Sequence, residues 1–222
     1  MKKVLLICLL SASVIVNAQT TETKYYRSRP FDEEVPQSKA KYSETITKED
    51  GVITTTTRNL KKDEIERREA WKGDEPVGKW IGLTGTGPEE RDYDFVLRYE
   101  ERTCENPDAI SALPDFFASN NVVGYTAPVI DYKDPQFMSF IRHKLRYPSK
   151  AVRHGIQGAV HLAFTITREG IIKDIVVTRG VDIVLDKEAV RVIRLLKLSS
   201  PAMLNGKPQE ICVKMPIQFK LS

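Results

Sequence analysis

The segment from residue 158 to residue 178 constrains the fold most, because its side chains alternate as a β-hairpin requires. Apolar residues recur at every second position of its first half, which places them on one face of a strand: Val160, Leu162, Phe164 and Ile166. Arg168-Glu169-Gly170 forms a turn in which the glycine supplies a positive φ. Residues 172–178 then return as a second strand. An isolated hairpin is marginal in water, so further elements must cover its apolar face.

Helices are expected on both sides of this hairpin. Asp134-Pro135 predicts a helix start, with Asp134 as N-cap and Pro135 at the first helical position. Pro148 ends this helix, and a further turn follows up to a C-cap at Gly155. After the hairpin, residues 185–196 are amphipathic. The apolar stripe holds Leu185, Ala189, Val192, Ile193 and Leu196, and the opposite side holds Lys187, Glu188, Arg191 and Arg194.

The last strand is expected over residues 210–221. Pro216 lies inside it, and a proline cannot donate to a strand ladder, which predicts an edge strand or a bulge. The order of elements is therefore αββαβ, and the fold class is α+β. A sheet of so few strands keeps an exposed edge, and such an edge can accept an extended segment of another protein as an added strand.

Four phrases in this region resemble the C-terminal domain of TonB-type energy transducers: Tyr147-Pro148, Gly155-Ile156-Gln157-Gly158, Arg179-Gly180-Val181-Asp182 and Asn205-Gly206-Lys207-Pro208. The resemblance implies a TonB C-terminal-like domain over residues 134–222. In that family an edge strand captures the TonB box of an outer-membrane transporter. The expected partner is thus a TonB-dependent transporter or another envelope protein. The residues expected to contact it are Lys144, Arg146, Tyr147, Pro148, Ile211, Val213, Lys214, Met215, Ile217, Gln218, Phe219 and Lys220.

The sequence departs from the family at three points. The family's Gln-Pro-Xaa-Tyr-Pro signature reads Lys144-Leu145-Arg146-Tyr147-Pro148, without the Gln-Pro pair. The phrase after the last helix reads Leu198-Ser199-Ser200-Pro201, without its tryptophan. The proline-rich spacer and the membrane helix that harvest energy at the inner membrane are not visible either. The resemblance therefore supports the TonB-like fold more than it supports the energy-transducing activity.

The first 18 residues are typical of a secretory signal peptide. Lys2 and Lys3 precede an apolar run over residues 4–16, which is shorter than the roughly 20 residues that span a bilayer. The run ends in Val16-Asn17-Ala18, which predicts cleavage after Ala18. We therefore expect an exported, periplasmic protein without a membrane span after cleavage. The alternative is an uncleaved anchor that makes the chain an inner-membrane energy transducer.

Residues 19–38 are expected to be an extended lead-in, residues 39–102 a small antiparallel β domain, and residues 103–133 a connector with a short helix near residues 108–118. The strands are expected at residues 42–46, 52–58, 65–71, 77–83 and 93–99. Residues 70–80, with Trp71-Lys72-Gly73 and Gly78-Lys79-Trp80, resemble the hairpin of bacterial MORN-like repeats, which implies a β-meander. Alternatively, the two tryptophans are core residues of a small sheet. The glycine-rich residues 82–87 are expected to form a mobile loop.

Charge is distributed unevenly along the chain. Residues 133–222 hold 16 basic and 7 acidic residues, whereas residues 19–132 hold 16 basic and 23 acidic ones. The two halves attract each other, or the basic half meets an acidic partner or anionic lipid, or both surfaces are simply solvated. Nucleic acid is not an expected partner for an exported chain. Cys104 and Cys212 are the cysteines outside the signal peptide, and their spacing leaves a disulfide open.

We expect no catalytic residue, cofactor or metal. His143, His154 and His161 have no paired acid or cysteine at a useful spacing, and no Cys-Xaa-Xaa-Cys motif is present. The sequence thus favours an envelope binding protein over an enzyme. A third interpretation is a structural module, in which the edge strand forms a homodimer or the C-terminal domain packs on the acidic N-terminal sheet.

Overall fold

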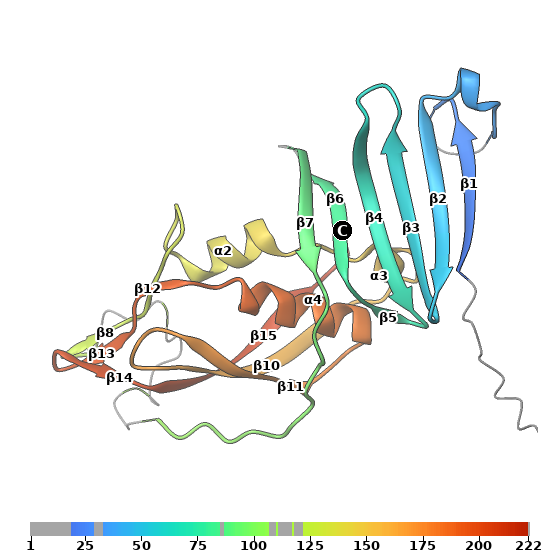
Figure 1. The fold of residues 1–222 in the computed structure, drawn as a ribbon. Helices are drawn as coiled ribbons and strands as arrows, with labels where there is room; N and C mark the ends of the chain where they lie inside the picture. The colour runs from blue at the N-terminus through green and yellow to red at the C-terminus, as the bar shows by residue number, and fades with distance from the viewer. Residues whose placement is uncertain are drawn as a thin grey trace, which may run out of the picture.

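The structure is a computed structural model, and it describes residues 19–28, 33–84, 87–106, 110, 117 and 122–221. The expected signal peptide and most of the helix expected at residues 108–118 lie outside the described residues. The described chain forms an N-terminal sheet and a C-terminal part with both helices and strands, which lie side by side (Figure 1). The domain boundaries given above stay a prediction.

The N-terminal half is an antiparallel meander. Its strands are β1 (Thr20–Tyr26), β2 (Tyr42–Glu49), β3 (Val52–Asn59), β4 (Glu64–Lys72), β5 (Glu75–Pro76), β6 (Lys79–Thr84) and β7 (Gly87–Asp92). They are ordered β1-β2-β3-β4-β6-β7, with β5 paired to β4. Asp50 and Gly51 both have positive φ, at 48° and 75°, which matches a two-residue hairpin turn. The expected β-meander is confirmed, and the likeness to MORN-like repeats stays a prediction.

Three local expectations for this half change. Residues 20–26 of the lead-in form β1, which pairs with β2 over its whole length. The loop expected at residues 82–87 is wrong for residues 82–84, which belong to β6, and for Gly87, which begins β7 and pairs with Thr84; residues 85 and 86 lie outside the described residues. The strand expected at residues 93–99 is also wrong: it forms only a single bridge between Tyr99 and Val177. Its alternation reflects contacts with a helix instead, because Tyr93 is 1% exposed and its hydroxyl donates to Glu188 on α4 (Ile183–Arg194).

The C-terminal half confirms the αββαβ order. It contains α2 (Phe137–Lys144), α3 (Ser149–Arg153), β10 (Gly158–Ile166), β11 (Ile172–Arg179), α4 (Ile183–Arg194) and β15 (Ile211–Phe219). Its main sheet has the order β11-β10-β15, so β15 lies at one edge. Short strands form two small extra sheets: β9 (Val129–Ile130) with β12 (Leu198–Ser200), and β8 (Tyr125–Thr126) with β13 (Ala202–Leu204) and β14 (Lys207–Gln209). The expected apolar face of β10 is buried in the core.

The helix starts follow different rules at α2 and α4. Asp134 is not the N-cap of α2, since the helix begins at Phe137 after Gln136. The Asp134 carboxylate instead accepts a hydrogen bond from the Gln136 N–H at 3.1 Å, which makes a local turn before the helix. At α4, Asp182 is the N-cap and accepts from the Val184 N–H at 3.0 Å.

The polar side of α4 is buried, which amphipathicity alone did not predict. Lys187, Glu188 and Arg191 are 1%, 0% and 3% exposed, whereas Arg194 is exposed. The N-terminal half covers this side, and it supplies partners for the buried charges. Lys187 Nζ contacts a carboxylate oxygen of Glu75 at 2.7 Å and donates to the carbonyl of Pro76 at 2.9 Å.

Glu188 is the centre of this contact between the halves. Its carboxylate accepts from the Tyr93 hydroxyl at 2.5 Å, from Arg191 Nε at 2.7 Å and from Arg191 Nη2 at 2.8 Å. The backbone N–H of Arg146 donates to it as well, at 2.6 Å. Burial raises the pKa of Tyr93, and the charge of Glu188 raises it further. Burial alone would lower the pKa of Arg191, but Glu188 raises it overall. The charge is therefore buried with its hydrogen bonds made.

Ion pairs across the boundary agree with attraction between the two halves. Arg146 pairs with Glu89 at 2.7 Å, and Lys150 pairs with Asp74. The Lys150 ammonium lowers the pKa of Asp74 through a hydrogen bond and its charge. Together with Lys187 and Glu75, these pairs place C-terminal cations on N-terminal carboxylates. The C-terminal domain thus packs on the acidic sheet through the side of α4 and through α3, not through β15.

Candidate functional site: the outer edge of β15

Strand β15 has one paired edge. Its pairing with β10 is antiparallel and unbroken, from Ile166↔Ile211 to Gly158↔Phe219. Within the described residues, no second strand pairs with its other edge. That outer edge presents a row of backbone groups outward and carries the predicted strand residues, so we treat it as the candidate site.

The hydrogen bonds of Cys212 show which backbone groups face outward. Its N–H and carbonyl both bond to the side chain of Asn106 rather than to β10. Backbone groups alternate between the two sides of a strand, so Lys214, Pro216 and Gln218 also face outward. Pro216 therefore has its missing N–H on the unpaired side and leaves the ladder with β10 intact. This explains how a proline is accommodated inside a regular strand, and the expected edge position is confirmed.

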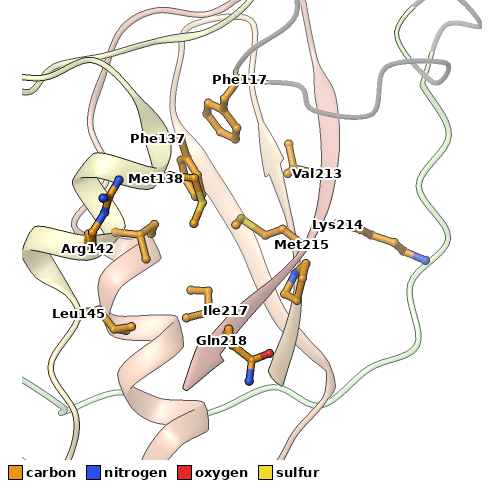
Figure 2. A pocket seen from close by; sticks show the side chains of 12 residues that line it. Phe117, Phe137, Met138, Arg142, Leu145, Val213, Lys214, Met215, Ile217 and Gln218 are labelled. Atoms are coloured by element: carbon orange, nitrogen blue, oxygen red, sulfur yellow. The ribbon is translucent and has the colours of Figure 1, made fainter. Parts of the chain in front are cut away.

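A groove runs along this edge beneath α2 (Figure 2). Its volume is about 530 Å³. The helix contributes Phe137, Met138, Ile141 and Arg142, its C-cap contributes Leu145, and the strand contributes residues 213–218; Phe117 completes the lining. The lining is mainly apolar, and Phe117 stacks on Phe137 with ring centroids 4.3 Å apart. The groove can therefore hold apolar side chains of a segment that lies beside β15.

Two cations line the same groove. Arg142 extends from α2 and Lys214 from β15 (Figure 2), and both are exposed. Neither makes an ion pair with a residue in the described part of the chain. Basic side chains without local partners attract acidic groups of an incoming segment.

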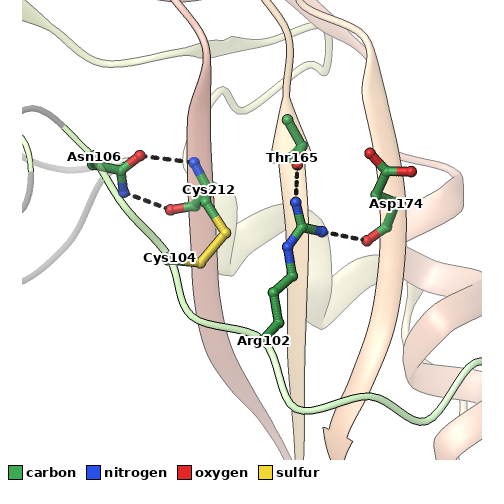
Figure 3. The surroundings of a disulfide bond; sticks show 6 residues. All are labelled: Arg102, Cys104, Asn106, Thr165, Asp174 and Cys212. Carbon is green, nitrogen blue, oxygen red and sulfur yellow. Dashed lines mark hydrogen bonds between the residues drawn. A yellow bond between two sulfur atoms is a disulfide. The ribbon is translucent and has the colours of Figure 1, made fainter.

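The helix-free face of the sheet is covered by residues 98–106, which we call the strap (Figure 3). At the β11 edge, the carbonyl of Arg98 in the strap accepts a hydrogen bond from the Val177 N–H at 2.8 Å. In the middle, Arg102 donates to the Thr165 hydroxyl at 2.5 Å and to the Asp174 carbonyl at 2.8 Å. Thr165 is consequently buried, at 3% exposed. The strap thus runs from one edge of the sheet to the other.

A disulfide fixes the strap at the β15 edge. Cys104 and Cys212 are bonded, with Cα atoms 5.2 Å apart, which settles the pairing that the sequence left open. Two residues further on, Asn106 Nδ2 donates to the Cys212 carbonyl at 2.7 Å, and Asn106 Oδ1 accepts from the Cys212 N–H at 2.8 Å (Figure 3). One end of the outer edge is therefore occupied by the chain itself.

The structure divides the predicted contact residues into three groups. Ile211, Val213, Ile217 and Phe219 are buried in the core, with Met215 half-buried beside them. Exposed positions on or just after β15 are Lys214, Gln218 and Lys220. The remaining four lie around the end of α2 and the start of α3: Lys144, Arg146, Tyr147 and Pro148. The candidate site thus gathers the strand residues but not the whole predicted set.

The residues between α2 and α3 are engaged within the protein. Arg146 pairs with Glu89, and the Tyr147 hydroxyl donates to the Ile156 carbonyl at 2.7 Å. The Tyr147 ring packs edge-on against Phe219 with centroids 5.6 Å apart. Pro148 is buried as the N-cap of α3. Their contacts support the domain, so we centre the candidate site on β15.

Sequence reasoning missed the strap and the α2 side of the groove. Asn106 stands before a proline, and this sequence context predicts only a connector. Its proximity to Cys212 could have been inferred from the cysteine two residues earlier, had the disulfide been assumed. Met138 and Ile141 belong to the helix that was expected at this place, but no pattern shows that they face a strand edge.

The described part of the chain holds no group of three or more His, Cys, Asp or Glu side chains suited to a metal ion. None of the helices described combines the length and the apolar character that a bilayer crossing demands.

Comparison with known proteins identifies the C-terminal domain. Residues 143–221 match the family model of the Gram-negative bacterial TonB protein C-terminal domain. This confirms the TonB resemblance for the domain that carries β15. No curated protein and no solved structure matches the chain.

Proposed function

We propose that this protein is a periplasmic, TonB-like binding protein that takes an extended segment of an envelope partner as an added strand on β15. The partner class is the outer-membrane transporter of TonB-dependent transport. The observation that carries the proposal is the outward-facing backbone from Lys214 to Gln218 beside an apolar groove, within a domain of the TonB C-terminal family. The proposal includes no catalytic step.

The geometry supplies both affinity and selectivity. The added strand would receive hydrogen bonds from the N–H groups of Lys214 and Gln218 and would donate to outward carbonyls of the same strand. Every second side chain of the added strand would enter the groove beneath α2, near Ile141 and Met215. Side chains on the other face would lie beside Lys214, where an acidic residue is favoured. A segment that alternates apolar and polar residues fits this arrangement best.

Export belongs to the proposal as well. The signal peptide expected over residues 1–18 places the domain in the periplasm, where a transporter segment is accessible. The competing arrangement keeps this segment as an inner-membrane anchor and makes the protein an energy transducer. Intact-mass measurement of the protein purified from its host separates the two, because a chain that starts at Gln19 has lost the anchor.

Proline substitution tests the strand-addition step. Lys214→Pro and Gln218→Pro each remove an outward N–H without touching the ladder to β10, as Pro216 already does. We expect each variant to fold and to lose most of its binding to a synthetic TonB-box peptide, measured by calorimetry. Lys214→Ala and Gln218→Ala keep the N–H and serve as matched controls, which should bind clearly better than their proline counterparts.

Two results would count against this assignment. Unchanged binding by both proline variants would exclude backbone pairing at these positions. A stable dimer in sedimentation that the same prolines dissociate would assign the edge to a second copy of the chain rather than to a transporter.

A further inference from the structure

We infer that Asn106 is the residue that sets where an added strand begins on β15. Its side chain already hydrogen-bonds to the outward N–H and carbonyl of Cys212, so pairing with a partner strand starts at Lys214. This inference rests on the proposed strand addition and names the residue of this chain that limits its register. It concerns the strap, which lies before the residues that match the family model.

The Asn106 carboxamide imitates one residue of a neighbouring strand. It offers an N–H donor to the Cys212 carbonyl at 2.7 Å and an oxygen acceptor to the Cys212 N–H at 2.8 Å. A residue of an antiparallel partner strand makes the same pair of bonds at a hydrogen-bonded position. An incoming strand would therefore have to displace both bonds before it could pair with Cys212.

The carboxamide is held rigidly enough to act as a stop. The disulfide joins the strap to β15 at Cys104, two residues away. On the other side of the disulfide, Arg102 is bonded to Thr165, which is the cross-strand neighbour of Cys212 on β10. Figure 3 shows these contacts in one row across the sheet. While the disulfide and the Arg102 hydrogen bonds persist, the strap cannot move away as a whole and separate Asn106 from Cys212.

With Asn106 in place, few backbone N–H groups of β15 remain for a partner strand, and they are not evenly spaced. The outward positions beyond Cys212 are Lys214, Pro216 and Gln218, and the proline has no N–H. An added strand thus receives two hydrogen bonds from β15 when Asn106 is in place. Without Asn106 it receives a third, from Cys212. We expect Asn106→Ala to bind a TonB-box peptide about three- to tenfold more tightly and one rung further along the strand.

Hydrogen exchange of single amides tests the inference on the full-length, disulfide-bonded protein. In the free wild type, we expect the Cys212 amide to be protected and the Lys214 and Gln218 amides to exchange rapidly. In free Asn106→Ala, the Cys212 amide should exchange rapidly as well. With a synthetic TonB-box peptide, Lys214 and Gln218 should become protected in both proteins, and Cys212 should become protected again in Asn106→Ala.

A conservative variant separates the register from general folding. Asn106→Asp keeps an oxygen that accepts from the Cys212 N–H but loses the donor to its carbonyl, so it should keep this amide protected and should not gain affinity for the peptide. A Cys212 amide that stays protected in free Asn106→Ala would overturn the inference, and so would unchanged peptide affinity together with unchanged protection. Absence of peptide protection at Lys214 and Gln218 in the wild type would instead refute the proposed function, because the exchange of Cys212 in the free proteins reports on Asn106 alone.

Discussion

Replacing Glu188 with Gln should destabilise the protein strongly, because this carboxylate neutralises a buried charge. The side chain of Glu188 is 0% exposed and accepts four hydrogen bonds, two of them from Arg191. Glutamine keeps the shape but removes the negative charge and turns one acceptor oxygen into an N–H₂ donor. Whichever oxygen it replaces, that donor faces an N–H of Arg191, together with either the N–H of Arg146 or the hydroxyl of Tyr93. Removing one partner of a buried ion pair costs about 3–5 kcal/mol, so we expect a loss of that size.

Urea unfolding measures this loss. Trp71 and Trp80 are the two tryptophans, and both lie in the N-terminal sheet near the contact with α4, so their fluorescence reports on the joined halves. Glu210→Gln is the matched control: Glu210 is exposed and pairs with Lys173 at 3.3 Å on the surface. Such a pair contributes about 0–1 kcal/mol. If the two variants lost equal stability, the buried carboxylate would not stabilise the contact between the halves.

Three other variants test the remaining features of the structure. Cys104→Ser with Cys212→Ser opens a loop of 108 residues; we expect a loss of about 2–5 kcal/mol in urea unfolding, and an unchanged midpoint would show that the crosslink does not stabilise the fold. Pro216→Ala should change the unfolding free energy by less than about 1 kcal/mol, because the restored N–H points away from β10; a larger loss would contradict the outward assignment. The pKa of Asp186 is raised by burial, so its ionisation weakens the fold as pH rises through that pKa. Asp186→Asn should therefore gain stability relative to the wild type between pH 3 and pH 7, and a pH-independent difference would contradict this.

Sequence patterns predicted the C-terminal strands and α4 because their causes are local. Alternation in β10, the positive φ of Gly170 and the apolar stripe of α4 all depend on neighbouring residues. Pro216 is an instructive case, since a proline within a strand restricts that strand to an edge. The edge position could therefore be predicted without knowledge of the tertiary contacts.

Contacts between distant residues were not predictable in the same way. The polar side of α4 follows the pattern of a solvated helix face, yet Glu188 is buried by a tyrosine 95 positions earlier. Tyr93 in turn belongs to a segment whose alternation is typical of a strand, although it lies outside the sheet. Periodicity reports which side of a segment is buried, but not whether a strand, a helix or another domain buries it.

The same limitation applies to the candidate site, because the connector determines which parts of the sheet remain accessible. α4 packs on one face of the sheet, and the strap crosses the other face and bonds to Val177 at the β11 edge. At the opposite edge, the Asn106 side chain occupies the outward N–H and carbonyl of Cys212 with hydrogen bonds. At the β15 edge, these contacts leave open the outward backbone beyond Cys212, which begins at Lys214. In the proposed strand addition, access to β15 therefore depends on residues 98–106, which lie outside the part of the chain that matches the TonB family model.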